Sequence, residues 1–136
     1  MSAGRCVHFN GIGNETCDAG VKYEDVRDTS TKPYSLPCLA EYNTAGATCD
    51  KCRYPTAEEL AAEKEEQRRF MEGMTKARAA IVAACGGPWK KGVTGSRGVI
   101  DCPVCGAVES LAYSRAGYNG HVHASCKTTG CVSWME

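Results

Sequence analysis

The chain has 136 residues, a formal net charge of zero and ten cysteines. This length predicts one ordinary domain or two very small ones. The zero net charge excludes a molecule-wide electrostatic attraction to nucleic acids or acidic lipid surfaces, although local charged patches remain compatible with it.

The N-terminal sequence MSAGRCVHFNG lacks the apolar core of a secretory signal. No apolar run approaches the ~18 residues that a membrane-spanning helix needs. We therefore expect a soluble, cytoplasmic protein without membrane contact. In a reducing cytoplasm cysteines stay free, so their number favours metal binding over disulfides. Large apolar residues are few, with two Phe and two Trp, and metal sites commonly stabilise such small cores.

Composition divides the chain into three segments, residues 1–55, 56–86 and 87–136. Residues 1–55 hold five cysteines among scattered Gly, Pro, Asn and Asp, which predicts a loop-rich cysteine module. The stretches VKYEDV and LPCLAEY within it have the composition of short strands or single helical turns. This segment is therefore expected to depend on metal ligands for its stability.

The most specific ligand pattern in this first segment is the C-x2-C pair formed by Cys49 and Cys52. We predict a zinc site of four cysteines, namely Cys17, Cys38, Cys49 and Cys52. Two further donors compete for places in it, namely Cys6 and His8. An iron–sulfur cluster also needs four cysteines and is a less favoured alternative. A redox role is disfavoured, because thioredoxin-like pairs belong to βαβ patterns and none is visible.

Residues 56–86 are rich in Ala, Glu, Lys, Arg and Met, which predicts one long helix of roughly 40–45 Å. Thr56 and Glu59 have the spacing of a capping box at its start. Gly86, Gly87 and Pro88 supply the stop signal. Gly73, in the middle, indicates a kink or a close contact.

The apolar residues of this helix lie mostly in its second half. They form a stripe expected to be buried, namely Phe70, Met71, Met74, Ala77, Ile81, Val82 and Cys85. We favour a half-exposed helix that links two metal modules. Dimerisation or partner binding through the helix is the alternative, and no heptad repeat is long enough to predict a coiled coil.

The third segment contains the strongest motif of the chain, Cys-Pro-Val-Cys-Gly followed about twenty residues later by Cys-Lys-Thr-Thr-Gly-Cys. These two pairs predict one closed zinc site with four thiolate ligands, namely Cys102, Cys105, Cys126 and Cys131. Gly106 permits the positive φ that such a turn often needs. With the second site, we expect two zinc ions per chain.

Between the two pairs, alternating residues predict two short antiparallel strands joined by a turn at Asn119-Gly120. Further strands are indicated at GVI (98–100) and at VSWM after the last cysteine. Residues 98–136 thus resemble a zinc ribbon. The whole chain is expected to be a small metal-stabilised α+β protein with a loop-rich cysteine module, one long central helix and a C-terminal ribbon.

His121 and His123 alternate with apolar residues, which places them on one strand face, outside the predicted zinc ligands. The ordinary interpretation is an exposed face without function. The functional one is a partner-binding surface of aromatic and basic side chains, namely Tyr113, Arg115, Tyr118, His121, His123 and Lys127. Such a surface suits single-stranded nucleic acid.

Sequence motifs of enzymes are missing. There is no Walker loop, dinucleotide-binding fingerprint or nucleophile elbow, and the zinc deaminase signature is absent. We therefore expect a protein that is not an enzyme.

The strings RCVHFNGIGNETCDAGVKY and CDKCRYPTAEE resemble small cysteine-rich proteins of tailed bacteriophages, a largely uncharacterised family. The resemblance covers about residues 5–70 and, with the ribbon, nearly the whole chain. It implies an accessory role in the host cytoplasm and gives no mechanism. We expect a phage protein that binds and modulates a host protein of the defence or transcription machinery. Nucleic-acid binding through the ribbon is the alternative.

Overall fold

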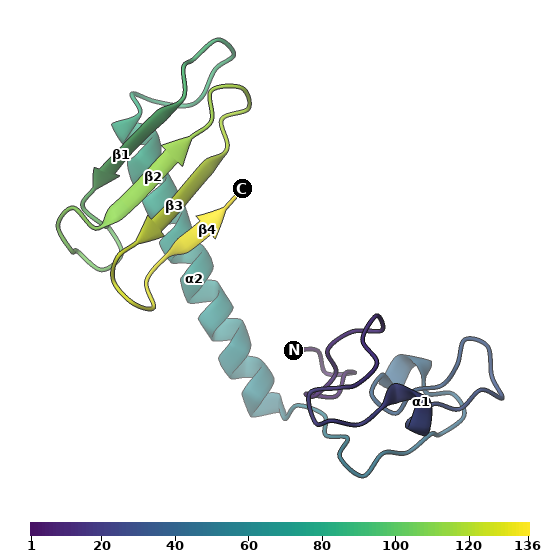
Figure 1. Cartoon of the computed structure of the whole chain (residues 1–136). Coiled ribbons are helices and arrows are strands. Elements are labelled where there is room, and N and C mark those ends of the chain that lie inside the picture. The colour runs from purple at the N-terminus through teal and green to yellow at the C-terminus, as the bar shows by residue number, and fades with distance from the viewer. The chain divides into compact units, whose positions relative to one another are not determined.

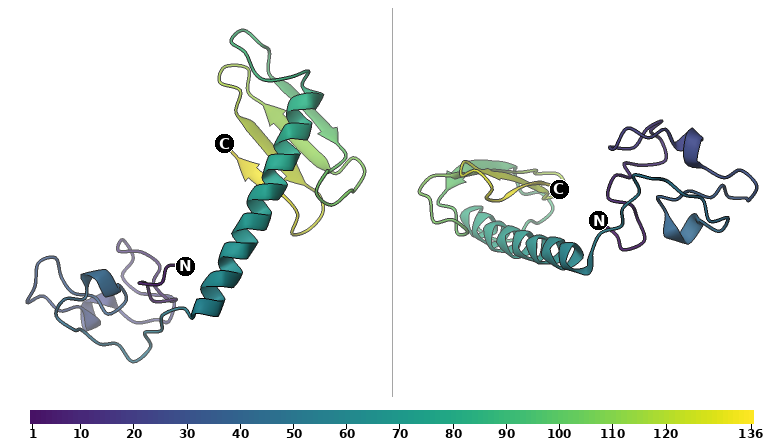
Figure 2. Two further views of the ribbon diagram at one scale, coloured as in Figure 1. Left: turned by 180° about the vertical axis from the view of Figure 1, so that it is seen from behind. Right: turned by 90° about the horizontal axis from the view of Figure 1, so that it is seen from below.

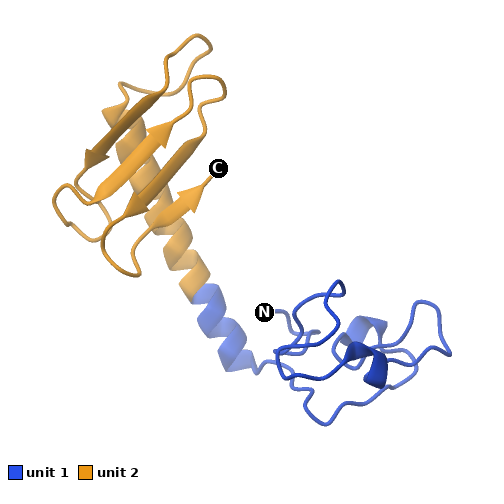
Figure 3. Ribbon diagram, in the orientation of Figure 1, with its two compact units in different colours: residues 1–65 blue, residues 66–136 orange.

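The computed structural model describes all 136 residues, which form two compact units, residues 1–65 and 66–136 (Figure 3). Composition had set residues 56–86 apart as a segment of their own. The boundary between the two compact units lies inside the long helix α2, Ala57–Ala84, after Glu65.

The first unit consists mainly of loops, as predicted. Its regular elements outside α2 are the helix α1, Tyr23–Val26, and the 3-10 helix η1, Ala40–Tyr42. Three isolated antiparallel bridges join its loops, namely Arg5 with Leu39, Thr16 with Lys22, and Asp28 with Ser35. Its core consists of Cys6, Cys17, Tyr23 and Cys38. Thiols thus occupy the positions that large apolar side chains would fill elsewhere.

The helix α2 begins where the capping box predicted. Thr56 Oγ1 accepts a hydrogen bond from the Glu59 amide at 3.1 Å, and Glu59 Oε2 accepts one from the Thr56 amide at 2.9 Å. Gly86 and Gly87 follow the last turn with φ of +84° and +124°, which ends the helix. No helix of the structure has the length and apolar character needed to cross a membrane.

Only part of the predicted apolar stripe of α2 is buried. Ala77 and Ile81 are fully buried, whereas Phe70 and Met71 are 41% and 49% exposed, so their predicted burial was wrong. Gly73 is buried, and a Cβ atom added there would lie only 3.1 Å from Cγ1 of Val132. The glycine therefore marks the predicted close contact.

The second unit contains a four-stranded antiparallel sheet in which each strand pairs with its neighbour in sequence. Its strands are β1, Ser96–Ile100, β2, Leu111–Arg115, β3, Val122–Cys126, and β4, Ser133–Met135. The second half of α2 lies along one face of this sheet, and the other face is open (Figures 1 and 2). Leu111 and Val122 are fully buried between sheet and helix. The predicted small α+β fold is thereby confirmed.

Candidate metal centre

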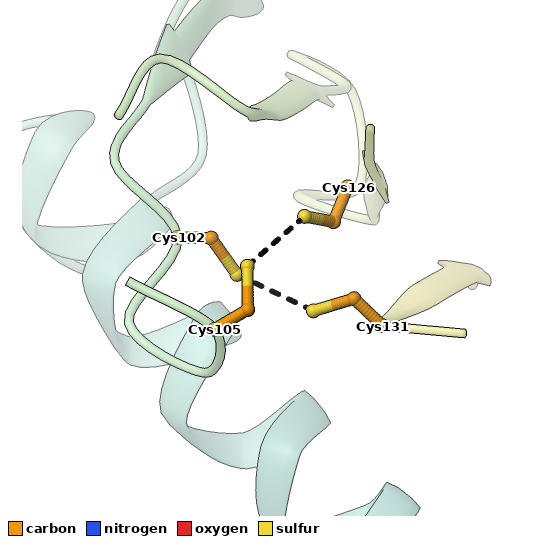
Figure 4. Close-up of side chains that lie close together, drawn as sticks. All are labelled: Cys102, Cys105, Cys126 and Cys131. Atoms are coloured by element: carbon orange, nitrogen blue, oxygen red, sulfur yellow. Dashed lines mark hydrogen bonds between the residues drawn. The ribbon is translucent and has the colours of Figure 1, made fainter. Parts of the chain in front are cut away.

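Four cysteine side chains converge at one end of the sheet (Figure 4). Cys102 and Cys105 lie in the loop after β1, Cys126 ends β3, and Cys131 lies in the loop before β4. All four Sγ atoms lie within 4.8 Å of one another. The Sγ atoms of Cys102 and Cys131 are 3.6 Å apart, and those of Cys105 and Cys126 are 3.7 Å apart.

These separations fit a tetrahedral metal site. Four thiolates at the usual Zn–S distance of ~2.3 Å occupy the corners of a tetrahedron with edges of about 3.8 Å. A disulfide would need sulfur atoms only about 2.05 Å apart, and all four cysteines are free. Two of the sulfur–sulfur distances match this edge and all four atoms lie within 4.8 Å of one another, so the cluster could hold one four-coordinate metal ion such as zinc.

Tight backbone turns hold the ligands in place. The Gly106 amide donates to the Cys102 carbonyl at 2.8 Å, and Gly106 has φ of +75°, as the sequence predicted for the residue after a C-x2-C pair. On the other side, the Cys131 amide donates to the Thr128 carbonyl at 3.1 Å, and Gly130 also has φ of +75°. Both turns therefore need a glycine beside a ligand.

The four thiols differ in their surroundings. A hydrogen bond with Ser110 lowers the pKa of Cys126 to about 6, and one with Thr128 lowers the pKa of Cys105. Burial raises the pKa of Cys131 to about 12. Because a metal ion binds cysteines as thiolates, its binding here would release the protons that these thiols carry.

Four of the six residues of the predicted partner-binding surface line one hollow at the sheet, namely Arg115, Tyr118, His121 and His123. Tyr118 is 84% exposed, and His121, His123 and Lys127 are also exposed. Tyr113 is half-buried on the sheet face that packs against α2. The histidines do not belong to the four-cysteine cluster.

Arg115 requires a correction, because its side chain is only 3% exposed. Its guanidinium donates to the carbonyl of Gly87 at 2.7 Å and lies 3.5 Å from that of Cys85. These carbonyls follow the last turn of α2, where a positive charge is favourable. Arg115 therefore caps the helix, although the sequence predicted an exposed side chain.

The cysteines of the first unit also gather, although less tightly. One small cavity is lined by all five of them and by His8, namely Cys6, His8, Cys17, Cys38, Cys49 and Cys52. Burial, with the charges of nearby thiols, raises the pKa of Cys38 to about 11. Burial, with a hydrogen bond to Cys6, raises that of Cys52 to about 12. The sulfur atoms do not reach the mutual closeness of the C-terminal group, so a second metal site is not shown.

A cleft in the first unit was not anticipated from the sequence. It has a volume of about 570 Å³, within the range of typical ligand pockets. Aromatic and apolar residues line much of it, namely Phe9, Ile12, Tyr23, Tyr34, Leu36, Leu39 and Tyr42. They come from loops and from the short helices α1 and η1, in a segment without periodicity, so the only signal in the sequence was this concentration of aromatic residues.

In comparisons with models of protein families, with curated proteins and with solved structures, nothing matched this chain. The resemblance of residues 5–70 to phage proteins therefore stays a hypothesis.

Proposed function

We propose that this protein is a zinc-stabilised, non-enzymatic accessory protein that binds a host protein through the aromatic cleft of its first unit. The cleft is the single observation that carries this proposal. Zinc serves as a structural ion, because four thiolates leave it no open coordination position for a substrate.

The chemistry of the cleft suits a protein partner. Ile12, Tyr34 and Tyr42 are 78%, 49% and 50% exposed, so apolar surface faces solvent around a hollow. The Arg27 guanidinium lies 5.3 Å from the centre of the Tyr34 ring, which limits the freedom of both side chains. Tyrosine and arginine are enriched among residues that dominate the energy of protein interfaces. An apolar side chain of a partner would thus contact side chains that are already partly ordered.

Charges in the cleft favour protein over nucleic acid. Lys22 and Arg27 are accompanied by Glu15 and Glu24 among the lining residues. A phosphate backbone would meet both carboxylates, whereas a protein segment with charges of both signs can match them.

Photo-crosslinking tests this proposal in living cells. The full chain, with a photoreactive phenylalanine analogue in place of Tyr34, is expressed in the bacterial host and irradiated. We expect a discrete crosslinked protein that is lost when Ile12→Glu is added. The same analogue at Tyr118, in the second unit, is the matched control.

Reconstitution with the purified crosslinked partner then decides the proposal. Calorimetry should show at least tenfold weaker binding for Ile12→Glu, since a charge would enter an apolar contact. Unchanged affinity, or crosslinks from position 118 alone, would overturn the assignment of the cleft.

Nucleic-acid binding is the second candidate, favoured by a hollow at the sheet that gathers part of the predicted surface. The charged and aromatic residues that line it are Arg97, Arg115, Tyr118, His121, His123 and Glu136. Fluorescence anisotropy with single-stranded oligonucleotides at low salt tests it. Binding that weakens steeply with salt and with Tyr118→Ala, but not with Tyr34→Ala, would support this candidate against the first.

The role in the cell rests on the resemblance to phage proteins and on the free thiols, which suit a reducing cytoplasm. The identity of the metal has its own test. Native mass spectrometry should show that replacing His121 and His123 together by alanine leaves the zinc content unchanged. Cys126→Ser should remove one zinc ion.

A further inference from the structure

We propose that the first unit holds a second metal ion, bound by Cys6, Cys38, Cys49 and Cys52. This assignment keeps three of the ligands expected from the sequence and replaces Cys17 by Cys6. It goes beyond the proposed function and does not depend on which partner the cleft binds.

Backbone hydrogen bonds join these four cysteines in two pairs. The Cys6 amide donates to the Cys38 carbonyl at 2.8 Å, which sets the two residues side by side. The Cys52 amide donates to the Cys49 carbonyl at 3.1 Å, which closes the C-x2-C turn. The backbone therefore presents two pairs of thiols, as four-cysteine metal sites do.

The two pairs also contact each other. The Arg53 amide donates to Cys6 Sγ at 3.3 Å, and Cys52 Sγ lies 3.2 Å from the Pro37 carbonyl. Each sulfur thus lies against the backbone that carries a cysteine of the other pair.

Cys17 packs in the same buried cluster as Cys6 and Cys38, but no hydrogen bond joins it to either pair. Its amide and carbonyl bond within its own loop, to the Val21 carbonyl at 3.0 Å and the Gly20 amide at 2.9 Å. The adjacent Asp18 amide donates to the His8 carbonyl at 2.9 Å, so this loop is tied to His8 instead. Cys17 and His8 therefore line the cavity without joining the two pairs.

The size of the cavity indicates a single ion. Its volume is about 10 Å³, roughly the space of one water-sized probe. A cluster of several iron and sulfide ions would need far more room, so the thiophilic ion expected here is zinc. Tyr23 lines both this cavity and the aromatic cleft, so the ion would also fix one wall of the cleft.

Native mass spectrometry of the full chain tests the ligand set. We expect two zinc ions in the wild-type protein and in Cys17→Ser, one in Cys6→Ser, one in Cys126→Ser and none in the variant that combines the last two. A single zinc in the wild-type protein would overturn the proposal. Loss of an ion from Cys17→Ser, while Cys6→Ser retains both ions, would also overturn it. Visible absorption from bound iron would do the same.

Cobalt substitution separates direct ligation from loss of folding. Cys6→His keeps a donor at this position, so it should retain two cobalt ions with shifted d–d absorption bands. Cys17→His should give the wild-type spectrum. An unshifted spectrum for Cys6→His, or a shifted one for Cys17→His, would show that the ligands are assigned wrongly.

Discussion

Replacing Arg115 by methionine should destabilise the second unit strongly, because the buried guanidinium caps α2. Methionine preserves most of the buried volume but removes the donors to the carbonyls of Gly87 and Cys85. A hydrogen bond from a charged donor contributes ~1.5–3 kcal/mol to the free energy of unfolding. The loss of the charge at the helix end adds about 0.5 kcal/mol.

The total loss is therefore about 2–3.5 kcal/mol, which for a unit of this size lowers the melting temperature by about 8–28 °C. Tryptophan fluorescence is the suitable assay, since the chain has two tryptophans, Trp89 and Trp134, and both lie in residues 66–136. The measurement thus reports on the affected unit alone.

The control is Arg97→Met, which removes an exposed arginine from the open face of the sheet and should leave the melting temperature unchanged. The reasoning is refuted if Arg115→Met melts like the wild-type protein. If that variant also bound single-stranded oligonucleotides less tightly, Arg115 would serve the partner-binding role expected from the sequence.

Further predictions concern the metal and the helix. Chelation should abolish the cooperative melting transition in tryptophan fluorescence, because metal binding contributes to the folding free energy, and added zinc should restore it. A transition that survives chelation would contradict a structural ion. Thr56→Ala should lower the free energy of unfolding by about 1 kcal/mol and speed hydrogen exchange in the first turns of α2, because it removes the cap bond to Glu59. The control Thr75→Ala, at an exposed position within the helix, should leave this exchange unchanged. Gly73→Val should lower the unfolding free energy by ~1–3 kcal/mol through a clash with Val132, measured by urea denaturation, and equal stability would exclude that contact.

Local signals in the sequence predicted the elements that depend on neighbouring residues. The capping box gave the start of α2 to within a residue, and the two cysteine pairs identified the tight cluster. The capping box and each single cysteine pair span only a few residues, so the spacing of their residues is enough to predict them. Side chains alternate between the two faces of β2, so Arg115, four residues after the inward-facing Leu111, is expected to face inward as well. The charge of Arg115 by itself does not show that its side chain is exposed.

The remaining features depend on contacts between distant loops. The proposal of Cys6 in place of Cys17 rests on the bond between the Cys6 amide and the Cys38 carbonyl, 32 residues apart in sequence, which no local pattern encodes. The cleft likewise collects Ile12, Tyr34 and Tyr42 from separate loops. In a segment without periodicity, such proximity is visible only in the folded chain.

The order of strands in the sheet has a consequence for how the C-terminal ligands assemble. Because every strand pairs with its neighbour in sequence, the sheet can form through short-range contacts, which favours rapid folding. Pairing of Leu111 with Cys126 sets the hairpin of β2 and β3 in register, and it brings the two ends that carry the cysteine pairs together. This register therefore places both halves of the four-cysteine cluster at the same end of the sheet.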